Sequence, residues 1–198
     1  MSKNINLIIF IFFLSLNTFS QEKQDSINIK KKLKEVIVNS LRVNETTPVS
    51  YTEMNSLEIE KNNLGQDLPY IISLTPSLIT NSDAGAGIGY TSLRLRGSDQ
   101  TRINVTINGI PLNDSESQGV WWVNMPDLSS SLESIQIQRG VGTSTNGAGS
   151  FGGSVNLNTG NTNSKAYLTI NSSSGSFATM KNNIEFGSGI INNKLSID

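Results

Sequence analysis

The chain has 198 residues and a formal net charge of −1, from 15 lysines and arginines against 16 aspartates and glutamates. This balance excludes a nucleic-acid-binding protein that depends on a basic surface. Cysteine and histidine are both absent from the sequence, which excludes disulfides, thiolate or imidazole metal ligands, and nucleophiles activated by histidine. We therefore expect no nucleic-acid partner, no metal site, no cofactor and no enzymatic activity.

Residues 1–20 have the pattern of a secretory signal. Lys3 is followed by the apolar run LIIFIFFL at residues 7–14 and by a small-x-small motif before Gln21. The apolar run is shorter than the about 20 residues that a membrane-spanning helix needs. The pattern predicts export, and a retained membrane anchor is the alternative.

Residues 21–43 are predicted to form a flexible N-terminal segment. The stretch from Gln21 to Lys32 is polar and has no periodicity, and its lysines are expected to be solvated. Apolar residues then alternate over residues 33–42. This alternation predicts either an extended segment that adds to the sheet edge of a partner or an ordinary edge strand.

The next residues predict a strand followed by two helices. Asparagine, serine and aspartate are good helix caps, proline is tolerated in a first turn, and glycine ends a helix. A strand is predicted over Thr47–Thr52. The first helix is capped by Asn55 or Ser56, has Glu58 in its first turn and stops at Gly65. The second helix covers Leu68–Leu74, with Asp67 as its cap and Pro69 in its first turn.

Short strands are predicted from residue 93 onward. In LRLRG at residues 93–97, alternation places Leu93 and Leu95 on one face and Arg94 and Arg96 on the other. The sequence VTINGIPL at residues 105–112 predicts a hairpin, because Asn-Gly favours the positive φ angles of a type I′ turn.

The loop that follows the hairpin contains Asp114, Glu116, Trp121 and Trp122. Two adjacent indoles cannot both face one way in an extended segment, so we expect one in the core and the other free to meet a ligand. The carboxylates do not have the spacing of a calcium loop.

A glycine pattern at residues 147–152 formally matches the G-x-G-x-x-G of dinucleotide sites. Such a site needs a helix after the glycines, whereas SVNLN at residues 154–158 alternates as a strand. The sequence therefore predicts tight backbone turns here and no nucleotide.

Residues 165–198 change to a two-residue alternation with turns at about ten-residue spacing, which is typical of transmembrane β-strands, and an ordinary antiparallel sheet of a soluble domain is the alternative. Ala166, Leu168 and Ile170 alternate with polar positions. Met180, Ile184 and Phe186 do the same after a turn near residues 172–176, and a third strand starts near Leu195.

Three motifs in this order, LRLRG at 93–97, INGIPLND at 107–114 and IQIQRG with its glycine-rich continuation at 135–153, resemble the plug domain of TonB-dependent outer-membrane receptors. The resemblance covers residues 33–160. It implies an α+β plug domain, a small mixed sheet with short helices, over residues 44–160. The first antiparallel strands of a transmembrane β-barrel would follow over residues 165–198. A barrel of about 22 strands cannot close from these residues, so we expect a fragment of a longer product.

The resemblance also implies roles for particular residues. Glu35, Val36, Ile37 and Val38 match the TonB box, which pairs as an added strand with the energising protein TonB. Arg94, Arg96 and Arg139 would latch the plug to carboxylates of the barrel wall. Trp121, Trp122, Asp114 and Glu116 would belong to a loop on the ligand side.

The implied function is active uptake of a scarce nutrient across the outer membrane, with a ferric siderophore or similar chelate as cargo. The plug would face the periplasm inside a barrel that contacts outer-membrane lipid. One alternative is a secreted or surface β-rich binding protein that does not transport. Another is a histidine-free hydrolase, which would need two of four carboxylates to converge in a cleft, namely Asp114, Glu116, Asp127 and Glu133.

Overall fold

The computed structural model describes residues 42–142, 146–147, 149–160, 163–191 and 195–197. The predicted export signal at residues 1–20 and the predicted TonB box, Glu35 to Val38, lie outside the described residues.

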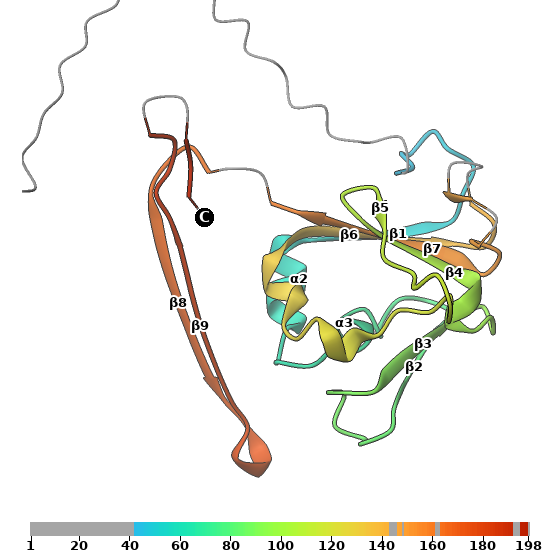
Figure 1. Ribbon diagram of the computed structural model, residues 1–198, viewed down its shortest axis with the longest axis horizontal. Coiled ribbons are helices and arrows are strands. Elements are labelled where there is room, and N and C mark those ends of the chain that lie inside the picture. Colours follow the sequence, from blue (N-terminus) through green and yellow to red (C-terminus); the bar gives the residue numbers. More distant parts are fainter. Residues whose placement is uncertain (1–41, 143–145, 148, 161–162, 192–194, 198) are drawn as a thin grey trace, which may run out of the picture. The chain divides into compact units, whose positions relative to one another are not determined.

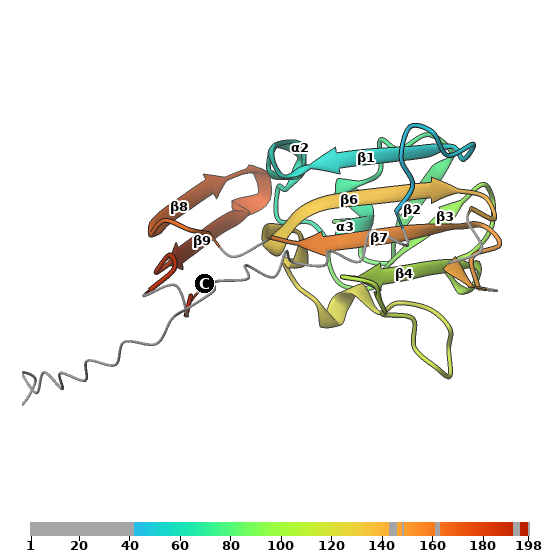
Figure 2. The ribbon, with the colours of Figure 1, turned by 90° about the horizontal axis from the view of Figure 1, so that it is seen from above.

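A mixed five-stranded sheet forms the centre of the domain (Figures 1 and 2). Its spatial order is β1 (Tyr51–Asn55), β6 (Leu132–Arg139), β7 (Gly153–Thr159), β4 (Ile103–Ile107) and β5 (Ile110–Pro111). Strands β4 and β7 pair in parallel, and the other neighbours pair antiparallel. The fold is thus the α+β plug with a small mixed sheet that the sequence predicts.

The hairpin β4–β5 turns at the predicted Asn-Gly pair. Asn108 and Gly109 have φ angles of 49° and 83°, as a type I′ turn requires. The first strand differs from the prediction, because it runs over Tyr51–Asn55 and not Thr47–Thr52. Asn44 holds residues 44–47 in a turn instead, since its side chain accepts hydrogen bonds from Thr46 and Thr47.

Helix α2 (Ser56–Asn62) begins at a capping box. The side chain of Asn55 accepts from the Glu58 amide at 3.0 Å, and the Glu58 carboxylate accepts from the Asn55 amide at 3.1 Å. The helix ends before the predicted Gly65 stop.

Helix α3 (Leu68–Ile71) is shorter than the predicted Leu68–Leu74. The predicted cap, Asp67, makes no side-chain bond to the helix; its carboxylate accepts from the Thr91 hydroxyl at 2.7 Å. Tertiary pairing has therefore replaced local capping at this position.

A separate hairpin, β2 (Leu78–Ser82) with β3 (Thr91–Leu95), carries the LRLRG motif. Leu93 and Leu95 are buried and Arg94 is exposed, as alternation predicts. Arg96 lies beyond the strand end in the left-handed region, with φ 51°. Figure 1 shows α2, α3 and this hairpin on one side of the central sheet.

The apolar core lies on that side of the sheet. The strands supply the alternate positions Ile135, Ile137, Val155 and Leu157, and one side chain of the Trp pair, Trp122, joins them. Its further members come from the helices, from β2–β3 and from β4: Ile59, Leu68, Ile71, Ile72, Leu78, Leu93, Leu95, Ile103 and Val105.

The opposite face of the sheet is buried but polar. Gln136, Gln138, Ser154, Asn156 and Thr106 are all buried. They form ladders of hydrogen bonds within the face, such as Thr106 Oγ1 to Asn156 Oδ1 at 2.8 Å and Gln138 Nε2 to Gln136 Oε1 at 3.2 Å. Both faces of the central strands are thus removed from water, one by apolar packing and one by paired amides.

The glycine pattern at residues 147–152 leads into strand β7, so the exclusion of a dinucleotide helix is confirmed. Gly152 and the following Gly153 also lie close to other parts of the domain. A Cβ on Gly152 would lie 2.5 Å from Ser98 Cβ, and one on Gly153 would lie 2.4 Å from the Gln138 carbonyl oxygen. These two glycines allow close contact inside the plug itself.

The C-terminal residues form the antiparallel hairpin β8 (Tyr167–Ser174) with β9 (Met180–Gly187). Leu168 pairs with Phe186 and Ile170 with Ile184, so one face is apolar, and all four side chains are exposed. A third strand is not formed in the described residues, where Ile191 and Leu195 make only an isolated bridge. Within the described residues, β8 and β9 form a two-stranded sheet. No helix among the residues described has the length and apolar character needed to cross a membrane.

Candidate functional site

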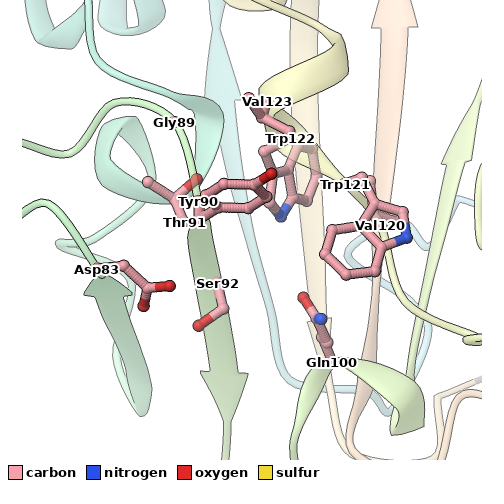
Figure 3. Close-up of a pocket in the computed structure, with 10 residues that line it drawn as sticks. All are labelled: Asp83, Gly89, Tyr90, Thr91, Ser92, Gln100, Val120, Trp121, Trp122 and Val123. Atoms are coloured by element: carbon pink, nitrogen blue, oxygen red, sulfur yellow. The ribbon is translucent and has the colours of Figure 1, made fainter.

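A cavity of about 180 Å³ opens between the β2–β3 hairpin and the loop that carries the two tryptophans (Figure 3). The hairpin contributes Asp83, Gly89, Tyr90, Thr91 and Ser92. The loop contributes residues 120–123, and a single 3-10 turn, Gln100–Arg102, contributes Gln100. Segments far apart in sequence therefore meet here, and we call this cavity the aromatic pocket.

The two adjacent indole side chains differ in their exposure to solvent. Trp122 is 2% exposed and belongs to the core, while Trp121 is 48% exposed at the pocket. Trp121 precedes the 3-10 turn Trp122–Asn124 and Trp122 is its first residue. This division agrees with the expectation that one indole packs in the core; a ligand role for the other stays a prediction.

The pocket includes polar atoms without partners. Gln100 Oε1 and Trp122 Nε1 are buried and have no hydrogen-bond partner among the described residues. Gln100 is held against the backbone at Gly119, where a Cβ would lie 2.9 Å from Gln100 Nε2. Figure 3 shows the Gln100 amide directed towards the two indoles.

Asp114 and Glu116 do not line the aromatic pocket. They belong to a larger, more open cavity of about 710 Å³ that is lined by polar side chains. Hydrogen bonds from the Ser117 backbone and side chain lower the pKa of Asp114, whose carboxylate accepts from the Ser117 amide at 2.7 Å. The structure thus separates the four residues predicted to share one ligand-side loop into two places.

The predicted latch arginines make no ion pair within the described residues, where the pairs are Arg42 with Glu53 and Lys181 with Asp127. Arg96 and the Arg139-Gly140 turn lie close together, since a Cβ on Gly140 would be 2.7 Å from Arg96 Nη1. Arg139 is half-buried, and its Nε has no hydrogen-bond partner in the part of the chain that the structure describes. Arg94 is exposed on β3.

Residues 42–43, which follow the predicted TonB box, are hydrogen-bonded to the polar face of the sheet. The Val43 amide donates to Gln136 Oε1 at 2.9 Å, and Gln136 Nε2 donates to the Val43 carbonyl at 2.9 Å. Arg42 donates to Ser134 Oγ at 2.9 Å. Burial lowers the pKa of Arg42, while Glu53 and Glu133 act in the opposite direction. We call the pair formed by Gln136 and Val43 the amide clamp.

The carboxylates considered for a hydrolase are not gathered into one cleft. Asp127 accepts from Lys181, Ser130 and Asn63, and Glu133 accepts from Asn158. Burial alone would raise the pKa of Asp127, but these hydrogen bonds, with that from Lys181 foremost, lower it. Within the described ranges, no group of three or more acidic side chains could hold a metal ion.

Sequence reasoning missed Tyr90, Gln100 and Gln136. Tyr90 and Gln100 stand in polar, glycine-containing surroundings that give no local signal, and only the fold brings them to Trp121. For Gln136, the alternation in IQIQ pointed the other way, since an apolar-polar pattern is typical of a strand with one face in solvent.

The short helices, the mixed sheet and the buried amide face together define a plug-type domain. The family model of the TonB-dependent receptor plug domain matches residues 43–154, which is more than half of the chain. The chain belongs to this family. No curated protein matches it.

Solved structures with a similar fold include uptake and siderophore receptors. The ferric yersiniabactin uptake receptor FyuA from Yersinia pestis is 15% identical, with a TM-score of 0.55 over 73% of this chain and 22% of that one. The siderophore receptor PirA from Acinetobacter baumannii is 19% identical, with a TM-score of 0.56 over 74% and 23%. This chain therefore spans less than a quarter of the length of either receptor.

Proposed function

We propose that this chain is the plug and first barrel strands of a TonB-dependent receptor that takes up a scarce nutrient across the outer membrane. The match to the plug family over residues 43–154 carries the proposal. The apolar face of the β8–β9 hairpin supports it, because exposed apolar residues at alternate positions suit a strand that faces lipid. The export signal at residues 1–20 would deliver the chain to that membrane.

Energy would enter through the TonB box, Glu35 to Val38, which would pair with TonB as an added strand. The amide clamp supports this coupling. Val43 lies five residues after Val38, so a pull on the box would load the bond between Arg42 and Ser134 and the bonds between Val43 and Gln136. These bonds are polar, and a polar contact gives way to water more readily than apolar packing does.

Arg94, Arg96 and Arg139 would hold the plug inside its barrel. Guanidinium groups suit carboxylates because their donors form a planar fork. The absence of an ion pair to any of the three among the described residues leaves them able to meet acidic side chains of the barrel wall.

The cargo we propose is a metal chelate such as a ferric siderophore. The structures that share this fold include the ferric yersiniabactin receptor, the siderophore receptor PirA and the copper transporter OprC. Family members are transporters, and the scattered carboxylates fit that role better than a hydrolase. A secreted binding protein without transport is the second candidate, and it makes no use of a TonB box.

The test is a cross-link between the box and TonB. Because the chain has no cysteine, Val36→Cys introduces a single reactive thiol in this part of the protein, and it should form a disulfide with a cysteine placed in the box-binding strand of TonB. Adding Ile37→Pro should abolish the cross-link, since proline removes a ladder donor and fixes φ. The control is Ile27→Pro, the same exchange in the polar tail, which should leave it unchanged. A cross-link that persists in Ile37→Pro, or never forms in the parent, would contradict the proposal.

A further inference from the structure

Within the part of the chain that the structure describes, one ion pair joins the plug to the C-terminal hairpin. Lys181 Nζ of β9 lies 2.8 Å from Asp127 Oδ1 of the plug, and it also donates to Ser130 Oγ at 3.2 Å. The stem of the same lysine lies beside Gly65, where a Cβ would be 3.6 Å from Lys181 Cδ. The side chain of Lys181 is 17% exposed as a result, because the plug contacts both its stem and its charged end.

The plug holds the acceptor of this lysine in a fixed position. Asp127 Oδ1 accepts from Ser130 Oγ at 2.8 Å and from Asn63 Nδ2 at 3.3 Å, and Asn63 Nδ2 also donates to Ser130 Oγ at 3.0 Å. We call these three residues the anchor site. An exposed ion pair contributes little when two flexible side chains must be ordered to form it. Here the carboxylate is already ordered by its neighbours, and the bond from the lysine is charge-assisted.

The face of β9 that carries Lys181 is the polar face. Lys181, Asn183 and Glu185 are half-buried and alternate with exposed residues that include Ile184 and Phe186. In a barrel strand the apolar face meets lipid and the polar face turns to the interior. The direction of Lys181 is therefore the one that a barrel residue needs to contact a plug.

The anchor site adjoins the strand that holds the N-terminal end of the plug. The 3-10 turn Leu128–Ser131 follows Asp127 and leads directly into β6, which carries Gln136 of the amide clamp. A pull on the clamp would be carried along β6 to the anchor site and from there to the hairpin. The barrel would thus resist the pull at the N-terminal end of β6.

We propose that Lys181 is a residue by which the first barrel hairpin holds the plug, with the anchor site as the surface that it binds. The polarity is opposite to that of the latch proposed for Arg94, Arg96 and Arg139, because here the cation stands on the hairpin and the acid on the plug. The inference rests on the proposed import function and adds a contact through which the barrel would oppose the pull of TonB.

A cross-link within the receptor tests the contact, in outer-membrane preparations of the protein as the cell produces it. The chain has no cysteine, so Asp127→Cys with Lys181→Cys introduces two thiols, which a short bismaleimide should join into one linked peptide. The matched control is Asp127→Cys with Tyr167→Cys. Tyr167 lies six residues along β8 from Ser173, the register partner of Lys181, which is about 20 Å, so this pair should give no linked peptide.

A charge exchange tests the polarity. Asp127→Lys or Lys181→Asp places like charges together and should speed cleavage by chymotrypsin after the exposed Leu64, beside Asn63, by about three- to tenfold. The two exchanges combined restore an ion pair and should return the rate to within about twofold of wild type. Asp127→Lys with Lys165→Asp, which changes an exposed lysine just before β8, should give no such rescue.

Two results would each overturn the proposal: a linked peptide no more abundant than in the Tyr167 control, or a combined exchange no better than the Lys165→Asp control. A reversal that prevents assembly is recognised by loss of the heat-modifiable band, and the cysteine pair, which brings no like charges together, then decides. The cross-link to TonB does not depend on the anchor site. If the TonB cross-link forms and the anchor tests fail, the import function stands and only the anchor is wrong.

Discussion

The side-chain amide of Gln136 holds the N-terminal end of the described plug in place. Gln136 lies in a strand between apolar residues, 1% exposed, and offers both of its amide atoms to the backbone of Val43. The Gln136 side chain thus hydrogen-bonds to both backbone groups of Val43, as a neighbouring strand would. Because both partners are buried, the loss of either one leaves buried polar groups that neither water nor protein can hydrogen-bond.

We predict that Gln136→Leu lowers the free energy of unfolding by about 1–3 kcal/mol, since the amide and carbonyl of Val43 lose their partners. The measurement is chemical denaturation of the chain, combined with limited proteolysis near residue 43, which should become faster. Gln66→Leu is the control: it removes an exposed bond to Ala86 and should change stability by no more than about 0.5 kcal/mol. Equal effects of the two variants would refute the clamp.

At the scale of elements, the loop after the β4–β5 hairpin is shaped by one carboxylate. Asp114 accepts from the amides of Glu116 and Ser117 and from the Ser117 hydroxyl. These bonds lower the pKa of Asp114, with the Ser117 backbone as the largest cause. Since only the ionised form accepts all of them, the loop is stabilised by ionisation.

A depressed pKa stabilises the fold above the ordinary carboxyl pKa and loses that contribution as pH falls through the lower, folded-state value. We therefore expect the Ser117 amide to be protected from hydrogen exchange at neutral pH, after correction for the intrinsic rate. Protection should disappear at acidity below the usual range of aspartate. Asp114→Ala should abolish both the protection and its pH dependence. A pH dependence that survives in Asp114→Ala would assign it to another group, such as Glu116.

At the scale of the whole molecule, the chain joins two kinds of β-structure that differ in how their faces are covered. The plug buries both faces of β6 and β7, two inner strands of its sheet, over most of their length. The β8–β9 hairpin instead leaves Leu168, Ile170, Ile184 and Phe186 exposed on one face. Such a face is unfavourable in water and suits contact with lipid.

We predict that Ile184→Arg impairs assembly in the outer membrane, because an arginine on a lipid-facing strand costs about 2–4 kcal/mol at the middle of the bilayer. The measurement is the fraction of heat-modifiable, folded protein in outer-membrane preparations. Asn183→Arg, one residue away on the other face, should assemble normally. Impairment by Asn183→Arg alone would reverse the assignment of the two faces.

Several elements could be predicted because the interactions that form them are local. The capping box of Asn55 and Glu58 spans three residues, and the Asn108-Gly109 turn depends on the backbone freedom of its own residues. The order of the three motifs was sufficient to predict the plug family. Alternation likewise separated Leu93 and Leu95 from Arg94.

Errors occurred where distant residues compete with local preference. Helix α3 ends at Ile71, and its predicted N-terminal cap, Asp67, accepts from Thr91 instead of from the helix. The aromatic pocket could not be predicted, since Tyr90, Gln100 and Trp121 are brought together only by the packing of the hairpin on the tryptophan loop.

The sequence by itself determined the class of this protein, its short helices, its turns and the side of each strand that is apolar, because backbone sterics and interactions over a few residues decide them. Only the tertiary structure decided that β4 and β7 pair in parallel and that the glutamine face of β6 is buried. It also decided that Trp122 and Gln100 meet at one pocket with unpaired polar atoms. These features depend on contacts between segments tens of residues apart, whose free energy no local pattern contains.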